Sequence, residues 1–249
     1  MLEMLNEIPV ACTTVEEVGS TGVGALTISF LIFIVSCIVF LSKANTSGEQ
    51  RKYYYLSSYA CGFAAMAYFA MLSGQGWTVI AGCRQFFYSH FAERLITSTL
   101  ILILMGNLAG AGPDLMFGAC GSNAIYMIAT YMGSVSVVTT VKWFWFFIGL
   151  VGLFATLVHL ALSFKNAVDV KGGERAQLYS KGAWLLILAW MCYPIVWLFS
   201  EGFASFSVSF EVCAYAVLDI ISTVVLGFMI MSGHDYLGGS APSQSREYV

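Results

Sequence analysis

Seven continuous apolar runs constrain the fold of this 249-residue chain more than any other feature. A helix of about 20 apolar residues can cross the hydrocarbon core of a bilayer, where every backbone polar group must be hydrogen-bonded internally. The runs are continuous rather than alternating, which favours helices over the strands of a membrane barrel. With ends good to a few residues, the predicted spans are 21–42, 54–76, 84–108, 115–133, 137–164, 179–200 and 210–232.

The composition agrees with a chain that lies mainly in lipid. Charged residues make up 10% of the sequence and hydrophobic residues 59%, whereas soluble domains average about 25% charged residues. We therefore predict an all-α, seven-transmembrane helix bundle in an integral, multi-pass membrane protein. The lipid bilayer is its expected partner, and no nucleic acid is expected. Residues 1–20 are predicted as an N-terminal segment, 21–233 as the membrane domain and 234–249 as a flexible tail.

The basic residues predict the orientation of the bundle. Only Arg84 and Lys142 lie near span ends on the N-terminal side, and Arg94 lies within a span. The other eight lie on the opposite side: Lys43, Arg51, Lys52, Lys165, Lys171, Arg175, Lys181 and Arg246. Because cytoplasmic loops carry the excess of lysine and arginine, the N-terminus is predicted outside and the C-terminus in the cytoplasm. The acidic N-terminus lacks the basic region of a standard secretory signal peptide, so the first helix is expected to direct its own insertion.

Charged side chains at membrane depth are the candidate functional residues. Glu93 and Arg94 lie in the third run and Asp219 in the seventh, and His90 precedes Arg94 by one turn. Each such charge costs at least about 2.5–3.5 kcal/mol to insert and usually faces a partner or a cavity. The default interpretation is functional, and the alternative is a structural ion pair that ties two helices together. Neither a metal-type spacing nor a nucleophile cluster occurs, so we expect no metal site, no catalytic residue and no enzyme.

The seven cysteines show no pattern that predicts their pairing. Cys37, Cys61, Cys192 and Cys213 lie inside apolar runs. We expect these residues to be thiols that pack as small hydrophobic side chains.

Three motifs on three runs resemble those of the microbial rhodopsins. WMCYPIVWL is similar to the helix-6 motif that packs against retinal, HFAERLITST to the helix-3 motif and AYAVLDIIST to the helix-7 motif Leu-Asp-x-x-x-Lys. The stretch ILILMGNLAG resembles the channelrhodopsins in particular. The resemblance covers nearly the whole chain and implies a retinal pocket. Its residues here are Tyr68, Thr97, Trp190, Tyr193, Pro194 and Trp197.

The chain departs from that family at its defining residue. Family members bind retinal through a helix-7 lysine, and this chain has Thr223 there, which cannot form an imine. At the position of the family's helix-3 arginine this chain has His90, and at the position of the tryptophan beside retinal it has Arg94. Glu93 and Asp219 keep the places of the carboxylate counterions. We expect no covalent cofactor, and we expect retinal to be present only if it binds non-covalently. We also predict that the Arg94 side chain enters the former retinal pocket and faces Asp219.

The function that follows from these departures is a non-pumping sensor, scaffold or subunit. The resemblance implies a homo-oligomer, as a dimer or trimer, or else a partner membrane protein. The alternative is a retinal-dependent light-gated ion channel or photoreceptor whose chromophore is non-covalent or supplied externally. The second run carries no carboxylate, which disfavours a cation channel, and Leu104 occupies the place where pumps commonly carry a proton donor.

Overall fold

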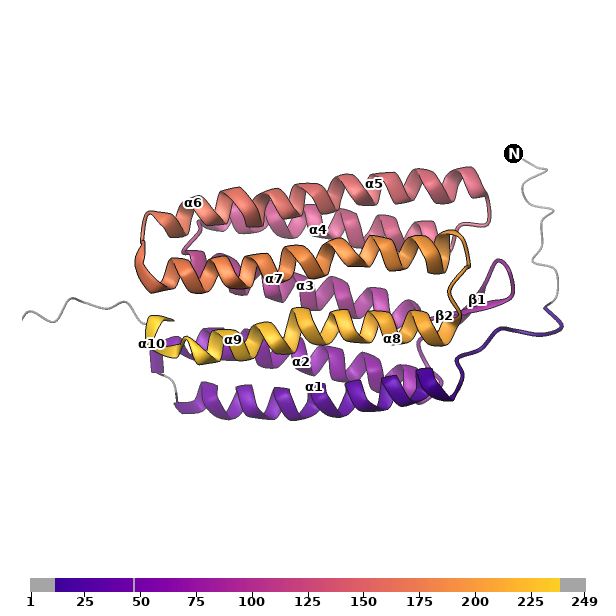
Figure 1. Cartoon of the computed structure of the whole chain (residues 1–249), viewed down its shortest axis with the longest axis horizontal. Helices are drawn as coiled ribbons and strands as arrows, with labels where there is room; N and C mark the ends of the chain where they lie inside the picture. Colours follow the sequence, from indigo (N-terminus) through magenta and orange to yellow (C-terminus); the bar gives the residue numbers. More distant parts are fainter. Residues whose placement is uncertain (1–11, 47, 238–249) are drawn as a thin grey trace, which may run out of the picture.

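The computed structural model describes residues 12–46 and 48–237, which form a bundle of antiparallel helices (Figure 1). Two helical rods continue through π-helical segments, at His159–Ser163 and Ile220–Val225, and a third such segment, Leu198–Gly202, extends α7. The helices are α1 (Ser20–Thr46), α2 (Arg51–Leu72), α3 (Tyr88–Ala109), α4 (Pro113–Ser134), α5 (Thr139–Val158), α6 (Phe164–Asp169), α7 (Gly173–Trp197), α8 (Val208–Asp219), α9 (Leu226–Ser232) and α10 (His234–Leu237). A short 3-10 turn, Gly48–Gln50, precedes α2. The predicted seven-helix bundle is confirmed.

Six of the rods are long and apolar enough to cross a membrane, and α4 is the seventh rod. The outward faces are apolar: on α5, for example, Val151 and Phe154 are about 70% exposed. Polar side chains such as Asn123 and Thr156 are buried between the helices instead. This arrangement of apolar surface and partly polar interior is the one that lipid requires.

Neighbouring rods along the chain pack side by side, and α8 packs against both α7 and α1, which closes the ring. Helix α3 also contacts α7 across the bundle. Local sequence signals set several helix ends. Pro113 starts α4, Gly110 ends α3 with a φ of +69°, and Ser207 caps α8 by accepting a hydrogen bond from the Phe210 amide. Proline at a first turn and glycine after a last turn are favoured for backbone reasons.

The second and sixth predicted spans differ from the structure at one end each. The second was predicted to reach residue 76, but α2 ends at Leu72 because Gly74 and Gly76 adopt positive φ angles. The sixth was predicted from 179, but α7 starts at Gly173, so Arg175 lies on the helix rather than before it. Arg175 donates to the carbonyl oxygens of Leu108 and Asn107, which explains why the helix extends that far.

A small hairpin covers one end of the bundle. Strands β1 (Thr78–Ile80) and β2 (Arg84–Phe86) pair antiparallel, so the third span starts at Tyr88 rather than at 84. Cys83, in the turn between the strands, forms a disulfide with Cys12. The sequence shows no pattern that predicts this pair, whereas the four cysteines expected to be thiols, Cys37, Cys61, Cys192 and Cys213, are free.

The predicted C-terminal tail does not begin at residue 234. Residues 234–237 form α10 instead, because the Tyr54 hydroxyl hydrogen-bonds His234 Nδ1 at 2.6 Å and Leu237 is buried. Residues 238–249 of that tail and residues 1–11 of the N-terminal segment lie outside the described part of the chain.

Gly152 on α5 packs directly against the backbone of α4. A Cβ atom there would lie 2.7 Å from the Tyr126 nitrogen and 2.9 Å from the Ser122 oxygen. We expect Gly152→Ala to destabilise the bundle by about 1–3 kcal/mol, because backbone atoms cannot move aside cheaply. Thermal unfolding in detergent would measure this. The matched control is Gly121→Ala on α4, where a Cβ meets nothing within 4 Å. Equal unfolding midpoints for the two variants would contradict this packing.

Candidate functional site

Asp219 lies at the centre of a buried polar cluster in the middle of the bundle. Its Oδ2 accepts a hydrogen bond from Tyr68 of α2 at 2.8 Å, and its Oδ1 accepts one from Tyr193 of α7 at 2.7 Å. His90 Nδ1 and Arg94 Nε, both on α3, lie 3.5 and 3.9 Å from the carboxylate oxygens. Three helices therefore converge on one carboxylate that is 3% exposed. The predicted contact between Arg94 and Asp219 is present.

Arg94 occupies the space beside the aromatic wall. Its guanidinium carbon lies 3.4 Å from the centroid of the Tyr193 ring and 5.9 Å from that of Tyr215. A separation of 3.4 Å is direct van der Waals contact, so no third group fits between the guanidinium and the Tyr193 ring. A desolvated cation over an aromatic face gains about 2 kcal/mol. Stacking and the nearby carboxylate together hold the buried charge.

Glu93 and His90 are the incompletely satisfied members of the cluster. Glu93 is 3% exposed, and within the described residues neither of its carboxylate oxygens has a hydrogen-bond partner. In the same part of the chain, His90 Nε2 has none either. The His90 ring stacks on Tyr215, with ring centroids 4.5 Å apart. Buried polar groups without partners are rare in native proteins and call for an explanation.

The two threonines, Thr97 and Thr223, are both buried, and each residue is 4% exposed. Thr97 donates to the backbone oxygen of Arg94 at 3.5 Å. Thr223 is buried within the π-helical segment that follows Asp219. Such π-helical bulges often occur at functional sites.

No lysine lies in this segment, Ile220–Val225. Lys181 on α7 precedes Tyr193 by 12 residues, which is about 18 Å along a helix. Lys142, at the start of α5, donates to the backbone oxygen of Glu201.

The other predicted pocket residues are buried but lie in different surroundings. Trp190 is part of the main apolar core, and Pro194 is buried within α7. Trp197 stacks on Phe146 at 4.6 Å and donates to the Ser134 hydroxyl at 2.7 Å. Of the predicted aromatic residues, the structure therefore brings Tyr68 and Tyr193 to Asp219 and gives Trp197 a separate packing role.

A second polar network, absent from the sequence predictions, lies nearer the hairpin. Arg84 of β2 is buried and donates to Glu16 at 3.2 Å, to Glu211 at 2.6 Å and to the Phe206 carbonyl at 2.7 Å. We call these contacts the Arg84 clasp. The sequence signal that could have revealed it is an arginine at the start of the third predicted span, on the side of the bundle where Glu16 and Glu211 also lie.

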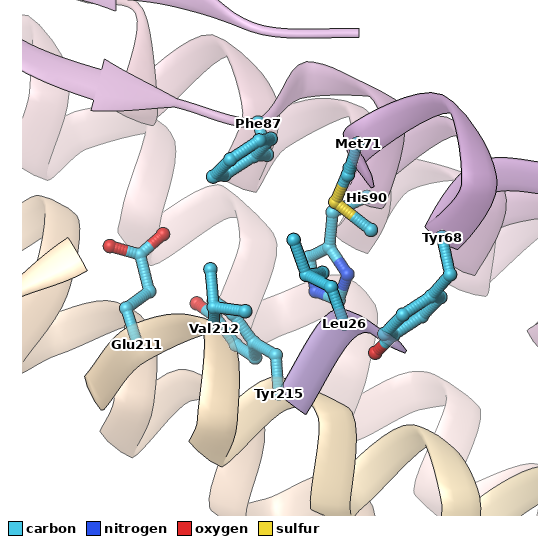
Figure 2. A pocket seen from close by; sticks show the side chains of 8 residues that line it. All are labelled: Leu26, Tyr68, Met71, Phe87, His90, Glu211, Val212 and Tyr215. Atoms are coloured by element: carbon cyan, nitrogen blue, oxygen red, sulfur yellow. The ribbon is translucent and has the colours of Figure 1, made fainter. Parts of the chain in front are cut away.

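A small cavity is lined by Glu211 of the Arg84 clasp and by His90 and Tyr68 of the Asp219 cluster (Figure 2). It has a volume of about 10 Å³, close to the space of one water molecule. Glu211 and Phe87 line it at one end, and His90 and Tyr68 line it towards the cluster. Tyr215, four residues before Asp219 on α8, also lines it and donates to Glu201 at 3.3 Å. That helical spacing was the available sequence signal for Tyr215.

Comparisons with known proteins agree with this fold. The family model described as "Bacteriorhodopsin-like protein" matches residues 23–237. Opsin-1 of Neurospora crassa is 25% identical in a match that covers 89% of this chain and 79% of that protein. Archaerhodopsin-1 of Halorubrum ezzemoulense is 26% identical in a match that covers 95% of this chain and 96% of that protein. The light-driven proton pump rhodopsin of Coccomyxa subellipsoidea superposes with a TM-score of 0.86 at 25% identity, covering 89% of this chain and 100% of that one.

Proposed function

The chain belongs to the bacteriorhodopsin-like family, and from this premise we propose that it is a member that works without retinal. It neither pumps protons nor forms a pigment, and it acts as a sensor, a scaffold or a subunit with a second copy or another membrane protein. Its relatives include a light-driven proton pump. In this chain, a sensor, scaffold or subunit role would take the place of that photochemistry.

The position of Arg94 is the observation that carries this proposal. Its guanidinium lies on the Tyr193 ring at 3.4 Å and faces Asp219 at 3.9 Å. In the resemblance described above, the residues at these three positions surround a protonated Schiff base and its polyene. Here a fixed side-chain cation takes that place, and an apolar polyene would have to displace a buried, paired charge at a cost of several kcal/mol.

The absence of an amine supports the same conclusion. Thr223 stands at the position of the lysine, and Lys181, the lysine on α7, lies about 18 Å along that helix from Tyr193. Leu104, at the place of a proton donor, is 2% exposed within an apolar stretch of α3. Proton transfer across the bundle therefore has no carboxylate at that depth on α3.

An absorption spectrum after incubation with all-trans retinal tests the proposal. We expect the washed wild-type protein to show no visible band, and Thr223→Lys with Arg94→Trp to show one, because the first change supplies an amine and the second removes the charge. The matched control is Thr223→Met with Arg94→Trp, which opens the pocket without an amine and should stay colourless after washing. A band in the washed wild type would overturn the proposal and restore light as the input.

A further inference from the structure

Three potential metal ligands lie together at the centre of the bundle. His90, Glu93 and Asp219 each offer one ligand atom, and these atoms all lie within 4.8 Å of one another. His90 and Glu93 are one turn apart on α3, and Asp219 approaches from α8. Ligand atoms around a tetrahedral Zn²⁺ ion lie about 3.3 Å apart, so rotamer shifts of roughly 1 Å would close the site.

The hydrogen bonding of these residues leaves buried donor and acceptor atoms that could coordinate an ion. Both Glu93 oxygens and His90 Nε2 are buried without a partner in the described residues, although Glu93 and His90 are at least nine-tenths buried. Asp219, in contrast, is held by Tyr68 and Tyr193, which fix its orientation. Hydrogen bonds to a ligating carboxylate are typical of metal sites, where they orient the ligand.

The local charge favours a cation as the ligand. Glu93 and Asp219 carry two negative charges when ionised, and Arg94 supplies one positive charge. Arg94 lies on the Tyr193 side of Asp219, 3.4 Å from that ring. No ion pair of the described residues joins Arg94 to Glu93, whereas Arg94 Nε lies 3.9 Å from Asp219.

The cavity in Figure 2 leads to the same residues. It is lined by His90 and Tyr68 at the cluster and by Glu211 towards the hairpin end. Its volume of about 10 Å³ fits one water-sized particle. The cavity therefore places room for one small particle beside His90, one of the three potential ligands.

We propose that this chain binds one zinc-class divalent metal ion through His90, Glu93 and Asp219. One imidazole with two carboxylates is a donor set that suits Zn²⁺ and its neighbours rather than Ca²⁺ or Mg²⁺, which prefer oxygen ligands alone. A water molecule would fill the fourth position, as in other zinc sites with three protein ligands. The ion would join α3 to α8, so that the sensor responds to metal instead of light; this inference rests on the proposed function.

Cobalt titration of the full chain tests the site directly. The protein carries an affinity tag without histidine, is freed of metal with a chelator, and is titrated with Co²⁺ in detergent without retinal. We expect visible d–d absorption that saturates at one equivalent and is abolished by Zn²⁺. We also expect Zn²⁺ in hundredfold excess over its dissociation constant to raise the unfolding midpoint by roughly 5 °C. The absence of a saturable Co²⁺ band would overturn the proposal.

Variants locate the ion. His90→Gln and Glu93→Gln should each weaken Co²⁺ binding at least about tenfold. His159→Gln, a change of the same kind at the π-helical segment between α5 and α6, should leave it unchanged. Equal affinity in His90→Gln and His159→Gln would contradict the site. If the cluster variants do not fold, X-ray absorption at the zinc edge of the zinc-bound wild-type protein tests the site instead. The spectrum must show one imidazole ligand, and a spectrum without one would overturn the proposal.

The two proposals fail in distinguishable ways. A retinal pigment in the wild type would overturn the proposed function, and the Co²⁺ titration of retinal-free protein would still show whether the ligands bind metal. A colourless wild type without a Co²⁺ band would overturn the metal site alone.

Discussion

Replacing Asp219 by alanine is expected to lower the free energy of unfolding by about 3–5 kcal/mol. The carboxylate accepts hydrogen bonds from Tyr68 and Tyr193 and faces Arg94, and all of these groups are buried. Removing it leaves a buried guanidinium without its nearest anion and two buried hydroxyl groups without their acceptor. The resulting loss of stability is larger than the net contribution of these contacts to the free energy of unfolding, because each buried group that loses its partner still carries the cost of its desolvation.

Unfolding in detergent of chelator-treated protein, free of bound metal, would measure the Asp219 effect. Asp169→Ala is the matched control, because Asp169 pairs with Lys165 on an exposed helix face and such pairs contribute about 0–1 kcal/mol. A double-mutant cycle with Arg94→Met should give a coupling energy of about 1–3 kcal/mol. The pairing of Arg94 with Asp219 would be wrong if that coupling were zero.

Replacing Arg84 by glutamine should cost a similar amount, about 3–5 kcal/mol. Arg84 is 4% exposed and binds the buried Glu211 at 2.6 Å, so its loss leaves an uncompensated carboxylate at the hairpin end. Thermal unfolding in detergent is again the measurement. Arg51→Gln is the matched control, since Arg51 is exposed and donates to a nearby backbone oxygen.

The two acidic partners of Arg84 should differ in the same experiment. Glu16 has a half-exposed side chain, whereas that of Glu211 is 6% exposed. Solvent screens the exposed pair, so Glu16→Gln should change stability by about 1 kcal/mol or less. If Arg84→Gln were no more harmful than Arg51→Gln, the Arg84 clasp would have no stabilising role.

The main elements of the fold were predictable because lipid imposes a simple rule. A continuous apolar run of about 20 residues can only be a helix in a bilayer, and seven such runs predict seven rods. The run 115–133, rich in glycine and serine, shows the limit of the rule. Its helix, α4, is recognisable from Pro113 at its start and its packing on α5, and it is not among the six that hydropathy alone identifies.

The ends of the rods were less predictable, because apolarity does not distinguish a helix from a buried loop or strand. Residues 84–86 are all buried and yet form β2, since Arg84 and its neighbours pair with β1 and with Glu16. The disulfide between Cys12 and Cys83 joins residues 71 positions apart, a proximity that no local pattern encodes.

The sequence by itself determined that this chain is a membrane bundle with an acid, an arginine and a threonine where the resemblance implies a chromophore site. Residue identity and helical spacing suffice for that, because both are local. Only the tertiary structure decided that Arg94 stacks on Tyr193 and that Glu93 is left without a hydrogen-bond partner in the described residues, while Arg84 binds Glu211. Those facts depend on side-chain directions across different helices, and the packing of the whole ring sets those directions.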